Sequence, residues 1–214
     1  MDTHQMVWNE KAAKDIISHL TKRRMEASYA ATAEQARKEI LAMIPKGTTV
    51  FRCGSMTAAG MGLWEAIAKL PDVKLIDPYR PELSREEGLE RRRQGMTADV
   101  MVASVNAITL DGKLDNLDGM GNRVAAMAFG PRKVNLVVGM NKVAPDLDSA
   151  IARVKHYAAP VNAIRLGIPT PCVETGLCSD CKSPQRICNI WSIIEGHMVK
   201  DRIHVKLVGD NLGY

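Results

Sequence analysis

Four cysteines lie close together near the end of the chain. They occur within 17 residues with the spacing Cys-x5-Cys-x2-Cys-x6-Cys, as Cys172, Cys178, Cys181 and Cys188. Clusters of this kind ligate zinc through four thiolates or hold an iron–sulfur cluster. The alternative is a set of buried or redox-active thiols without metal. The fifth cysteine, Cys53, stands apart and is expected to serve packing.

A second group of polar residues runs from Asn106 to Arg123. Its Asp111-Gly112 pair is explained by the turn of a β-hairpin. The stretch Asp118-Gly119-Met120-Gly121-Asn122-Arg123 instead places a carboxylate, an amide and a guanidinium around two glycines, ahead of a predicted helix. Such a segment can cradle an anionic ligand, which Arg123 could hold with two parallel hydrogen bonds. The alternative is an elaborate turn.

A third segment, Gly54-Ser55, forms a tight turn between a predicted strand and a predicted helix. Glycine lets backbone approach a ligand, and the start of a helix can hold an anion. The alternative is that Ser55 simply caps the helix. The sequence therefore predicts a ligand site lined by Gly54, Ser55, Asn106, Asp118, Gly119, Gly121, Asn122 and Arg123.

Alternating strands and helices must position these residues. Short apolar runs predict strands, and apolar residues at helical spacing predict the helices between them. This alternation predicts an α/β fold with a mainly parallel sheet and helices on both faces. Strands are predicted at 49–52, 73–76, 100–105, 134–139 and 203–208, a hairpin at 108–114, and helices at 6–24, 32–45, 63–70, 84–95, 122–129 and 147–157.

Composition narrows the class of protein. The 214 residues are 46% hydrophobic and 25% charged, as expected for a globular chain. The net charge of +5 is spread out, and no aromatic residues accompany the basic runs, so nucleic-acid binding is not expected. No secretory signal and no apolar stretch of about 20 residues is found, which predicts a cytoplasmic protein without a membrane span. Cytoplasmic thiols stay reduced, which favours metal or redox chemistry over disulfides.

These segments together resemble the lactate-utilisation (LUD) domain family, the group that includes LutC and YkgG proteins. The longest shared stretches are 106–112, 116–125 and 207–214, and shorter ones are Gly54-Ser55, 98–100, 129–131 and 138–142. The cysteine cluster resembles a stand-alone branch of that family. The resemblance divides the chain into an N-terminal helical segment, residues 1–30, and a LUD domain, residues 31–214, which includes the cysteine-bearing loop 171–189.

The resemblance implies a three-layer α/β/α sandwich like that of the NagB/RpiA/CoA transferase group. It also implies a link to lactate or related organic-acid oxidation beside iron–sulfur partner proteins. One hypothesis is therefore an enzyme or enzyme subunit that binds a small anionic metabolite and carries a metal at its cysteines. The alternative is a non-catalytic redox-partner or regulatory module. The sequence leaves catalysis itself open, and a homodimer is one candidate assembly because such folds often dimerise.

Overall fold

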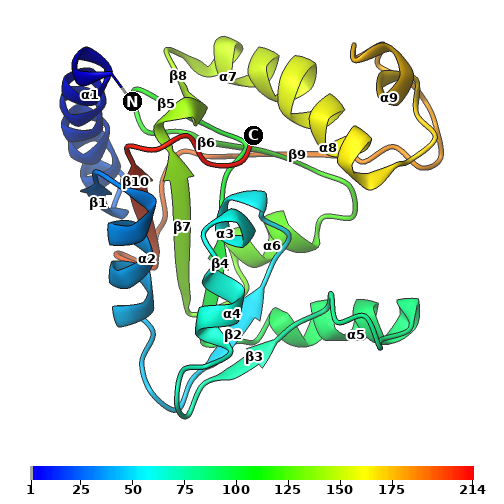
Figure 1. The fold of residues 1–214 in the computed structure, drawn as a ribbon, viewed down its shortest axis with the longest axis horizontal. Coiled ribbons are helices and arrows are strands. Elements are labelled where there is room, and N and C mark those ends of the chain that lie inside the picture. The colour runs from blue at the N-terminus through cyan, green and yellow to red at the C-terminus, as the bar shows by residue number, and fades with distance from the viewer. Residues whose placement is uncertain (1) are drawn as a thin grey trace.

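The fold centres on a six-stranded, fully parallel sheet. The computed structural model describes residues 2–214. The strand order is β1-β10-β7-β4-β2-β3 (Figure 1). The predicted mainly parallel sheet is thus confirmed. Its strands are β1 (Glu26–Ala30), β2 (Thr49–Arg52), β3 (Lys74–Ile76), β4 (Val100–Ala103), β7 (Lys133–Gly139) and β10 (Ile203–Val208).

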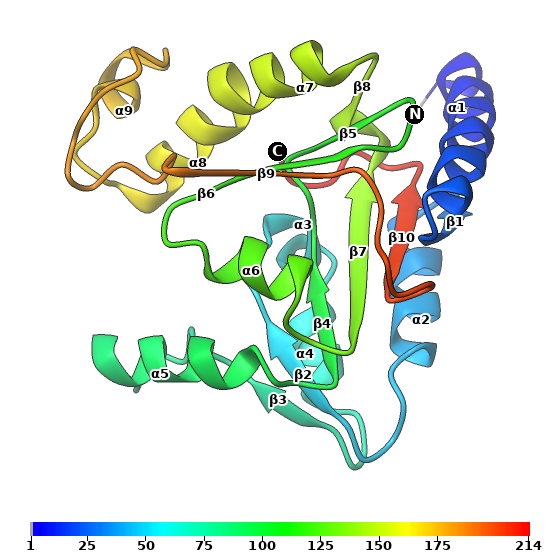
Figure 2. The same ribbon diagram turned by 180° about the vertical axis from the view of Figure 1, so that it is seen from behind.

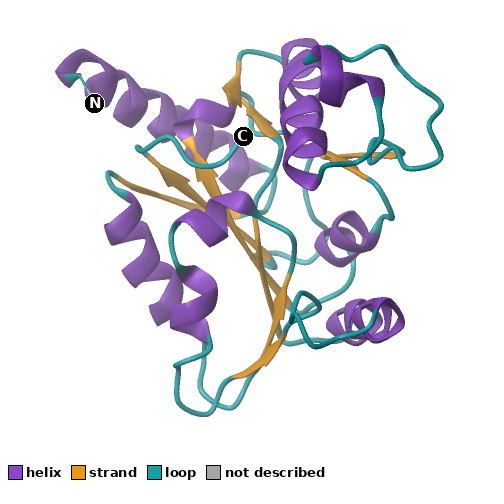
Figure 3. Cartoon of the chain, turned by 45° about the vertical axis from the view of Figure 1, so that its right-hand side comes forward, coloured by secondary structure: helices purple, strands orange, loops and turns teal. Residues whose placement is uncertain are grey.

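Helices cover both faces of this sheet, giving the expected three-layer sandwich (Figure 3). Strand residues alternate between the faces, so that Val50 packs on one side and Phe51 on the other. One face is covered by α2 (Ala33–Ala42), α3 (Met56–Gly60) and α4 (Leu63–Ile67). The other carries α1 (Thr3–Lys22) and α6 (Asn122–Ala128), and α5 (Arg85–Gly95) packs beside β2 and β3.

Side-chain caps fix several helix starts where the sequence predicts them. Thr32 accepts a hydrogen bond from the Gln35 amide, and Ser84 forms a full capping box with Glu87. The structure corrects other boundaries. Residues 26–30, placed in an N-terminal helical segment by the sequence, form the edge strand β1 instead. Its burial is incomplete on both faces, so no clear alternation marked it as a strand.

A second, four-stranded sheet crosses the end of the first. Its order is β8-β5-β6-β9, and it includes the predicted hairpin, β5 (Ala107–Thr109) with β6 (Leu114–Asp118). Strands β8 (Val143–Ala144) and β9 (Ile190–Ile194) complete it. Strand β9 was not predicted from the sequence. Three of its five residues are exposed, and its pairing partner, β6, lies far away in the chain. Figure 2 shows this sheet running beneath α7 and α8.

The helix over the small sheet is longer than the predicted 147–157. It comprises α7 (Leu147–Arg153), a π-helical turn (Val154–Ala158) and α8 (Ala159–Leu166), followed by α9 (Pro171–Thr175). Ala150 and Val154 pack on Ala107 and Leu117 of the small sheet. Figure 2 shows the helix starting above the end of β7 and running away from it, toward the side of the molecule where β2 and β4 lie. None of the helices in residues 2–214 combines the length and apolar character needed to cross a membrane.

Candidate functional site

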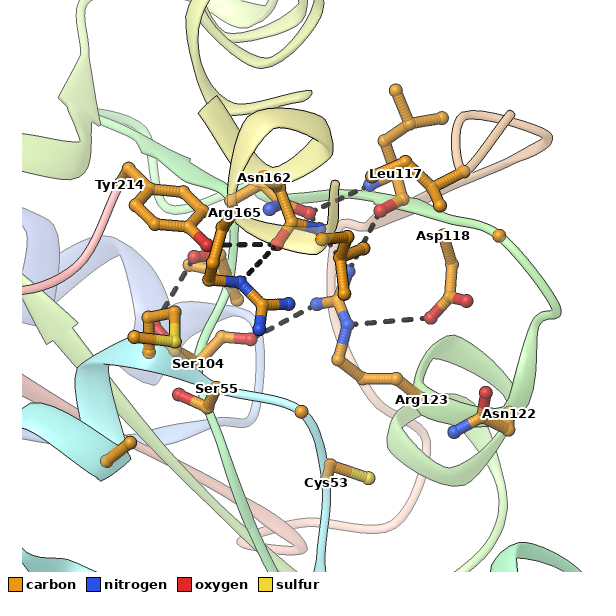
Figure 4. Close-up of a pocket in the computed structure, with 18 of the residues that line it drawn as sticks. Cys53, Ser55, Ser104, Leu117, Asp118, Asn122, Arg123, Asn162, Arg165 and Tyr214 are labelled. Atoms are coloured by element: carbon orange, nitrogen blue, oxygen red, sulfur yellow. Dashed lines mark hydrogen bonds and ion pairs between the residues drawn. The ribbon is translucent and has the colours of Figure 1, made fainter. Parts of the chain in front are cut away.

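A pocket of about 340 Å³ opens at the carboxyl ends of the parallel strands. Open α/β sheets generally bind ligands at this edge. The walls come from the ends of β2 and β4, the start of α6, helix α8 and the C-terminal residue Tyr214 (Figure 4). Five cationic side chains line it against a single carboxylate, Asp118: Arg52, Arg92, Arg123, Lys142 and Arg165.

Arg123 has the most hydrogen-bond and ion-pair partners of these cations. Its terminal nitrogens donate to the side chains of Asn116 (2.6 Å) and Asn106 (2.9 Å) and to the carbonyls of Ser104 and Leu117. Its Nε lies 3.5 Å from Asp118 Oδ2. All three guanidinium nitrogens therefore have protein partners, and the side chain is only 12% exposed. Arg123 links the end of β4 to the hairpin, and its guanidinium has few free hydrogen-bond donors for a ligand.

The rest of the predicted cradle is also explained by internal contacts. Asp118 Oδ1 accepts hydrogen bonds from the amides of Met120 (3.1 Å) and Gly121 (3.0 Å), which closes a tight turn. A Cβ at Gly119 would lie 3.3 Å from Ile187 Cα, and one at Gly121 would lie 2.9 Å from Ile190 Cδ1. Gly121 also has a φ of +86°. The two glycines therefore make room for the following chain, and Asn122 lines the pocket at its rim.

The Gly54-Ser55 turn also has a local explanation. Ser55 accepts a hydrogen bond from the Ala58 amide and caps α3, which has only five residues. A Cβ at Gly54 would lie 2.9 Å from the hydroxyl of Tyr79. Both residues line the pocket. Gly54 lets the chain pass close to Tyr79, and Ser55 begins α3.

Two arginines are stacked on aromatic rings at one side of the pocket. Arg52 pairs with Asp77 at 2.8 Å, and its Cζ lies 5.3 Å from the ring centroids of both Trp64 and Tyr79. Arg92 lies 5.0 Å from the Tyr79 ring. Cation–π stacking of this kind holds a guanidinium in place while leaving hydrogen-bond donors for another group. This wall therefore presents positive charge in a fixed position.

Arg165 faces the pocket from α8, on the opposite side. Its Nε donates to Asn162 Oδ1 at 3.0 Å, and the same amide oxygen accepts from the Tyr214 hydroxyl at 2.9 Å. In Figure 4 the guanidinium of Arg165 turns toward the space that Arg123, Ser55 and Ser104 also face. Because Arg165 is exposed, its terminal nitrogens are well placed to meet an incoming anion.

Lys142 lies at the floor of the pocket and is only 3% exposed. Its ammonium donates to Thr57 Oγ1 (3.0 Å), Ser104 Oγ (3.1 Å) and the Val105 carbonyl (3.1 Å). Burial, reinforced by Arg153 and Arg123, lowers the pKa of Lys142 to about 7. An amine that titrates near neutral pH can give or take a proton during a reaction.

The four clustered cysteines line a separate, smaller recess beside α8. It has a volume of about 20 Å³, and its other walls are mainly apolar. All four thiols are free and partly buried. Among residues 2–214, no three His, Cys, Asp or Glu side chains stand arranged to hold a metal ion. The four cysteines predicted to bind zinc or an iron–sulfur cluster do line one recess together, and metal binding by them stays a prediction.

Cys53 also lines the large pocket, but it is 1% exposed and packs in the main core, as expected. Burial raises the pKa of its thiol far above the usual value. Cys53 is therefore held as an unreactive thiol.

Four of the five basic residues that line the pocket were not predicted from the sequence. Arg52, Arg92, Lys142 and Arg165 lie far apart in the chain, each in an unremarkable local context. Two of them lie where a predicted strand ends: Arg52 is the last residue of the strand at 49–52, and Lys142 comes three residues after the strand at 134–139. The predicted residues Asn106, Asp118 and Arg123 do meet at the site, but they bond chiefly to one another.

Comparisons with known proteins agree with this architecture. Residues 13–208 match the LUD domain. The structure is similar to that of a DUF162 family protein from Deinococcus radiodurans, with a TM-score of 0.52 and 15% sequence identity. The alignment covers 94% of this chain and 98% of that one, and shows a shared fold. A search of curated protein sequences gives no match.

Proposed function

The chain belongs to the LUD domain family, which is associated with lactate utilisation, and we propose that its pocket binds a small organic acid or phosphorylated metabolite. The observation that carries the proposal is the charge of the pocket: five basic side chains line it, and of these only Arg52 and Arg123 form an ion pair with a carboxylate among the described residues. A cluster of like charges around a cavity is costly unless an anion completes it. The volume of about 340 Å³ suits a small metabolite or part of a larger one.

Arg165 is the residue we expect to contact the anion directly. The guanidinium of Arg123 is already hydrogen-bonded to Asn106 and Asn116, and Arg52 is paired with Asp77. Arg165 uses its Nε for Asn162 and also hydrogen-bonds to Tyr214, which orients the exposed guanidinium at the pocket wall, where it can meet a carboxylate or phosphate. Tyr214 shares the same amide oxygen and so steadies the arrangement from the C-terminal end.

The position and pKa of Lys142 favour a chemical reaction of the ligand over binding alone. Its ammonium sits beside Thr57 and Ser104 at the end of the sheet, within the walls of the same cavity. With a pKa of about 7 it can act as a general acid or base toward a bound hydroxy or keto acid. The proposed function is thus binding of an organic-acid anion, with Lys142 as the proton-exchanging group.

Isothermal titration calorimetry tests the binding step. The ligands are lactate, pyruvate, a sugar phosphate and a CoA ester, measured with wild type, Arg165→Met and Arg93→Met. Arg93 is an exposed arginine on α5 that does not line the pocket, so it gives a matched loss of charge. We expect Arg165→Met to weaken binding about tenfold or more, since charge-assisted hydrogen bonds contribute roughly 1.5–3 kcal/mol. Arg93→Met should bind as wild type does.

Two results would contradict the proposal. One is the absence of heat with every ligand in the wild-type protein. The other is equal weakening by Arg165→Met and Arg93→Met, which would mean that only overall charge matters. Either result would favour a non-catalytic module that docks on a redox partner.

A further inference from the structure

We propose that Cys172, Cys178, Cys181 and Cys188 bind a metal centre through their thiolates, and that this centre holds one wall of the anion pocket in place. The inference concerns a site separate from the proposed organic-acid site. It rests on four observations: the shared recess, the loop contacts that fix the cysteine backbones, the charge around the recess, and the contacts that join the loop to the pocket.

The recess brings together cysteines from both ends of the loop. Cys172 comes from α9, and the other three come from the segment 178–188 that returns toward β9. The remaining walls include Ala159, Pro160 and Ala163 of α8. A cavity of about 20 Å³ has room for a single ion such as Zn²⁺, whereas an iron–sulfur cluster requires the loop to move outward. Metal binding would draw the four thiols inward from these walls, as happens where the metal itself completes its site.

Arg186 holds the backbones of two of the cysteines. Its Nε and Nη2 donate to the Cys188 carbonyl, at 3.1 and 2.7 Å, and its Nη1 donates to the Cys181 carbonyl. The Thr170 hydroxyl lies 3.3 Å from Cys172 Sγ. These contacts fix the positions of Cys172, Cys181 and Cys188, although the loop that carries them has little regular structure. A role of the thiols as metal ligands accounts for these hydrogen bonds in an otherwise irregular loop.

The charge around the recess suits thiolate ligands. Lys155 lies near the thiols of Cys178 and Cys188, and Arg186 lies near those of Cys181 and Cys188. Both cations also reach Asp180, at 2.6 and 3.5 Å. Four thiolates around Zn²⁺ or a four-iron cluster leave a net negative charge, and neighbouring cations offset it. Zinc and an iron–sulfur cluster share this ligand chemistry, and the experiment below separates them.

The cysteine loop also forms part of the anion pocket. Ile187 lines both cavities. The Asn189 amide donates to the Asp118 carbonyl at 3.0 Å, and its side chain donates to the Gly119 carbonyl at 3.1 Å. Gly119 is tightly packed against Ile187. Any movement of the loop on metal loss therefore reaches Asp118 and the pocket wall directly.

Metal analysis of protein purified without oxygen and without chelators tests the proposal. We expect either about one zinc per chain in a colourless protein, or iron and inorganic sulfide in a brown protein that dithionite bleaches. Both outcomes support the site. Cys181→Ser and Cys188→Ser should each lose most of the metal, while Cys53→Ala, which removes a thiol outside the loop, should retain it.

Cobalt gives a readout that does not depend on how the variants fold. Wild-type protein stripped of metal should bind Co²⁺ and develop the intense thiolate-to-cobalt absorption of a tetrahedral sulfur site, and circular dichroism should show the fold intact. The proposal is overturned if anaerobic wild type contains no metal and the stripped protein gives no such band. It is also overturned if the cysteine variants keep full metal content. Organic-acid binding is measured separately, so failure of one site does not imply failure of the other.

Discussion

The two recesses differ in how they are held together. The cation-lined pocket is built on residues that follow buried parallel strands, and its deepest cations, Arg123 and Lys142, already have protein partners. The cysteine recess is built on a loop whose residues are mostly exposed or half-buried. The first is preorganised by the fold, whereas the second needs an occupant to define it. The contrast suggests that the sheet sets the ligand geometry and the loop adjusts it.

Removing Arg123 should have the largest effect, because it breaks the preorganised side. Arg123→Met leaves Asp118 and the side-chain oxygens of Asn106 and Asn116 without their shared donor. Losing one partner of a buried ion pair destabilises a protein by about 3–5 kcal/mol. Urea unfolding measures this loss. Arg165→Met, on an exposed cation of the same pocket, should change stability by less than about 0.5 kcal/mol. Equal losses in the two variants would remove the distinction between framework and ligand-facing arginines.

Lys142 should make stability depend on pH. The folded pKa is about 7, against a usual value of 10.5, so between these values the unfolded chain binds one more proton. The free energy of unfolding therefore rises with pH across that window, and the contribution is lost as pH falls through 7. Lys142→Met removes this slope, so wild type should gain about 2 kcal/mol on the variant between pH 7 and pH 9. Urea unfolding at several pH values measures it.

The exposed Lys38→Met variant is the control for Lys142. Lys38 pairs only with Glu34 on the surface of α2, with 75% of each side chain exposed. It should follow the wild-type pH dependence. A constant difference between wild type and Lys142→Met from pH 6 to pH 9 would show that the buried amine does not titrate there.

Asp115 offers a test under the helix that carries Arg165. Both its carboxylate oxygens are buried, and no well-formed hydrogen bond reaches them among the described residues, although the backbone amide of Asn116 lies nearby. Burial raises the pKa of Asp115 to about 6. The folded state thus binds the extra proton between about pH 4 and pH 6, so this contribution to stability is lost as pH rises. Asp115→Asn should stabilise the protein by about 1–2 kcal/mol at pH 8 and by little at pH 4.

Thermal unfolding of Asp115→Asn and wild type at the two pH values measures the difference. Asp15→Asn, on an exposed carboxylate of α1, should change stability by less than about 0.5 kcal/mol at either pH. An Asp115→Asn variant less stable than wild type at pH 8 would indicate a partner for the carboxylate.

Arg186→Met should have a small effect on global stability and a strong effect on the loop alone. It removes three donors to the Cys181 and Cys188 carbonyls within the loop. We expect global stability to fall by about 1 kcal/mol or less, with faster amide exchange confined to residues 171–189. Strands β7 and β10 should exchange as in wild type. Hydrogen exchange by mass spectrometry measures both, and faster exchange spread over the central strands would contradict the separation of loop from framework.

Local patterns in the sequence predicted most of the framework. Continuous apolar runs marked β4 and β7, capping residues such as Ser84 marked helix starts, and Asp111-Gly112 marked the hairpin. These features depend on neighbours within a few residues, where spacing and side-chain chemistry suffice. Strands β1 and β9 escaped prediction because their partners, β10 and β6, are distant in the chain and their own burial is partial.

The sequence by itself determined the parallel α/β scaffold, the grouping of Asn106, Asp118 and Arg123, and the clustering of four cysteines. Only the tertiary structure decided what these groups do. It turned Arg123 inward to satisfy buried amide and carbonyl oxygens, and it brought Arg52, Lys142 and Arg165 to one cavity from elements far apart in the chain. The physical reason is that a buried cation must find acceptors, and which acceptors lie near it depends on packing between distant segments.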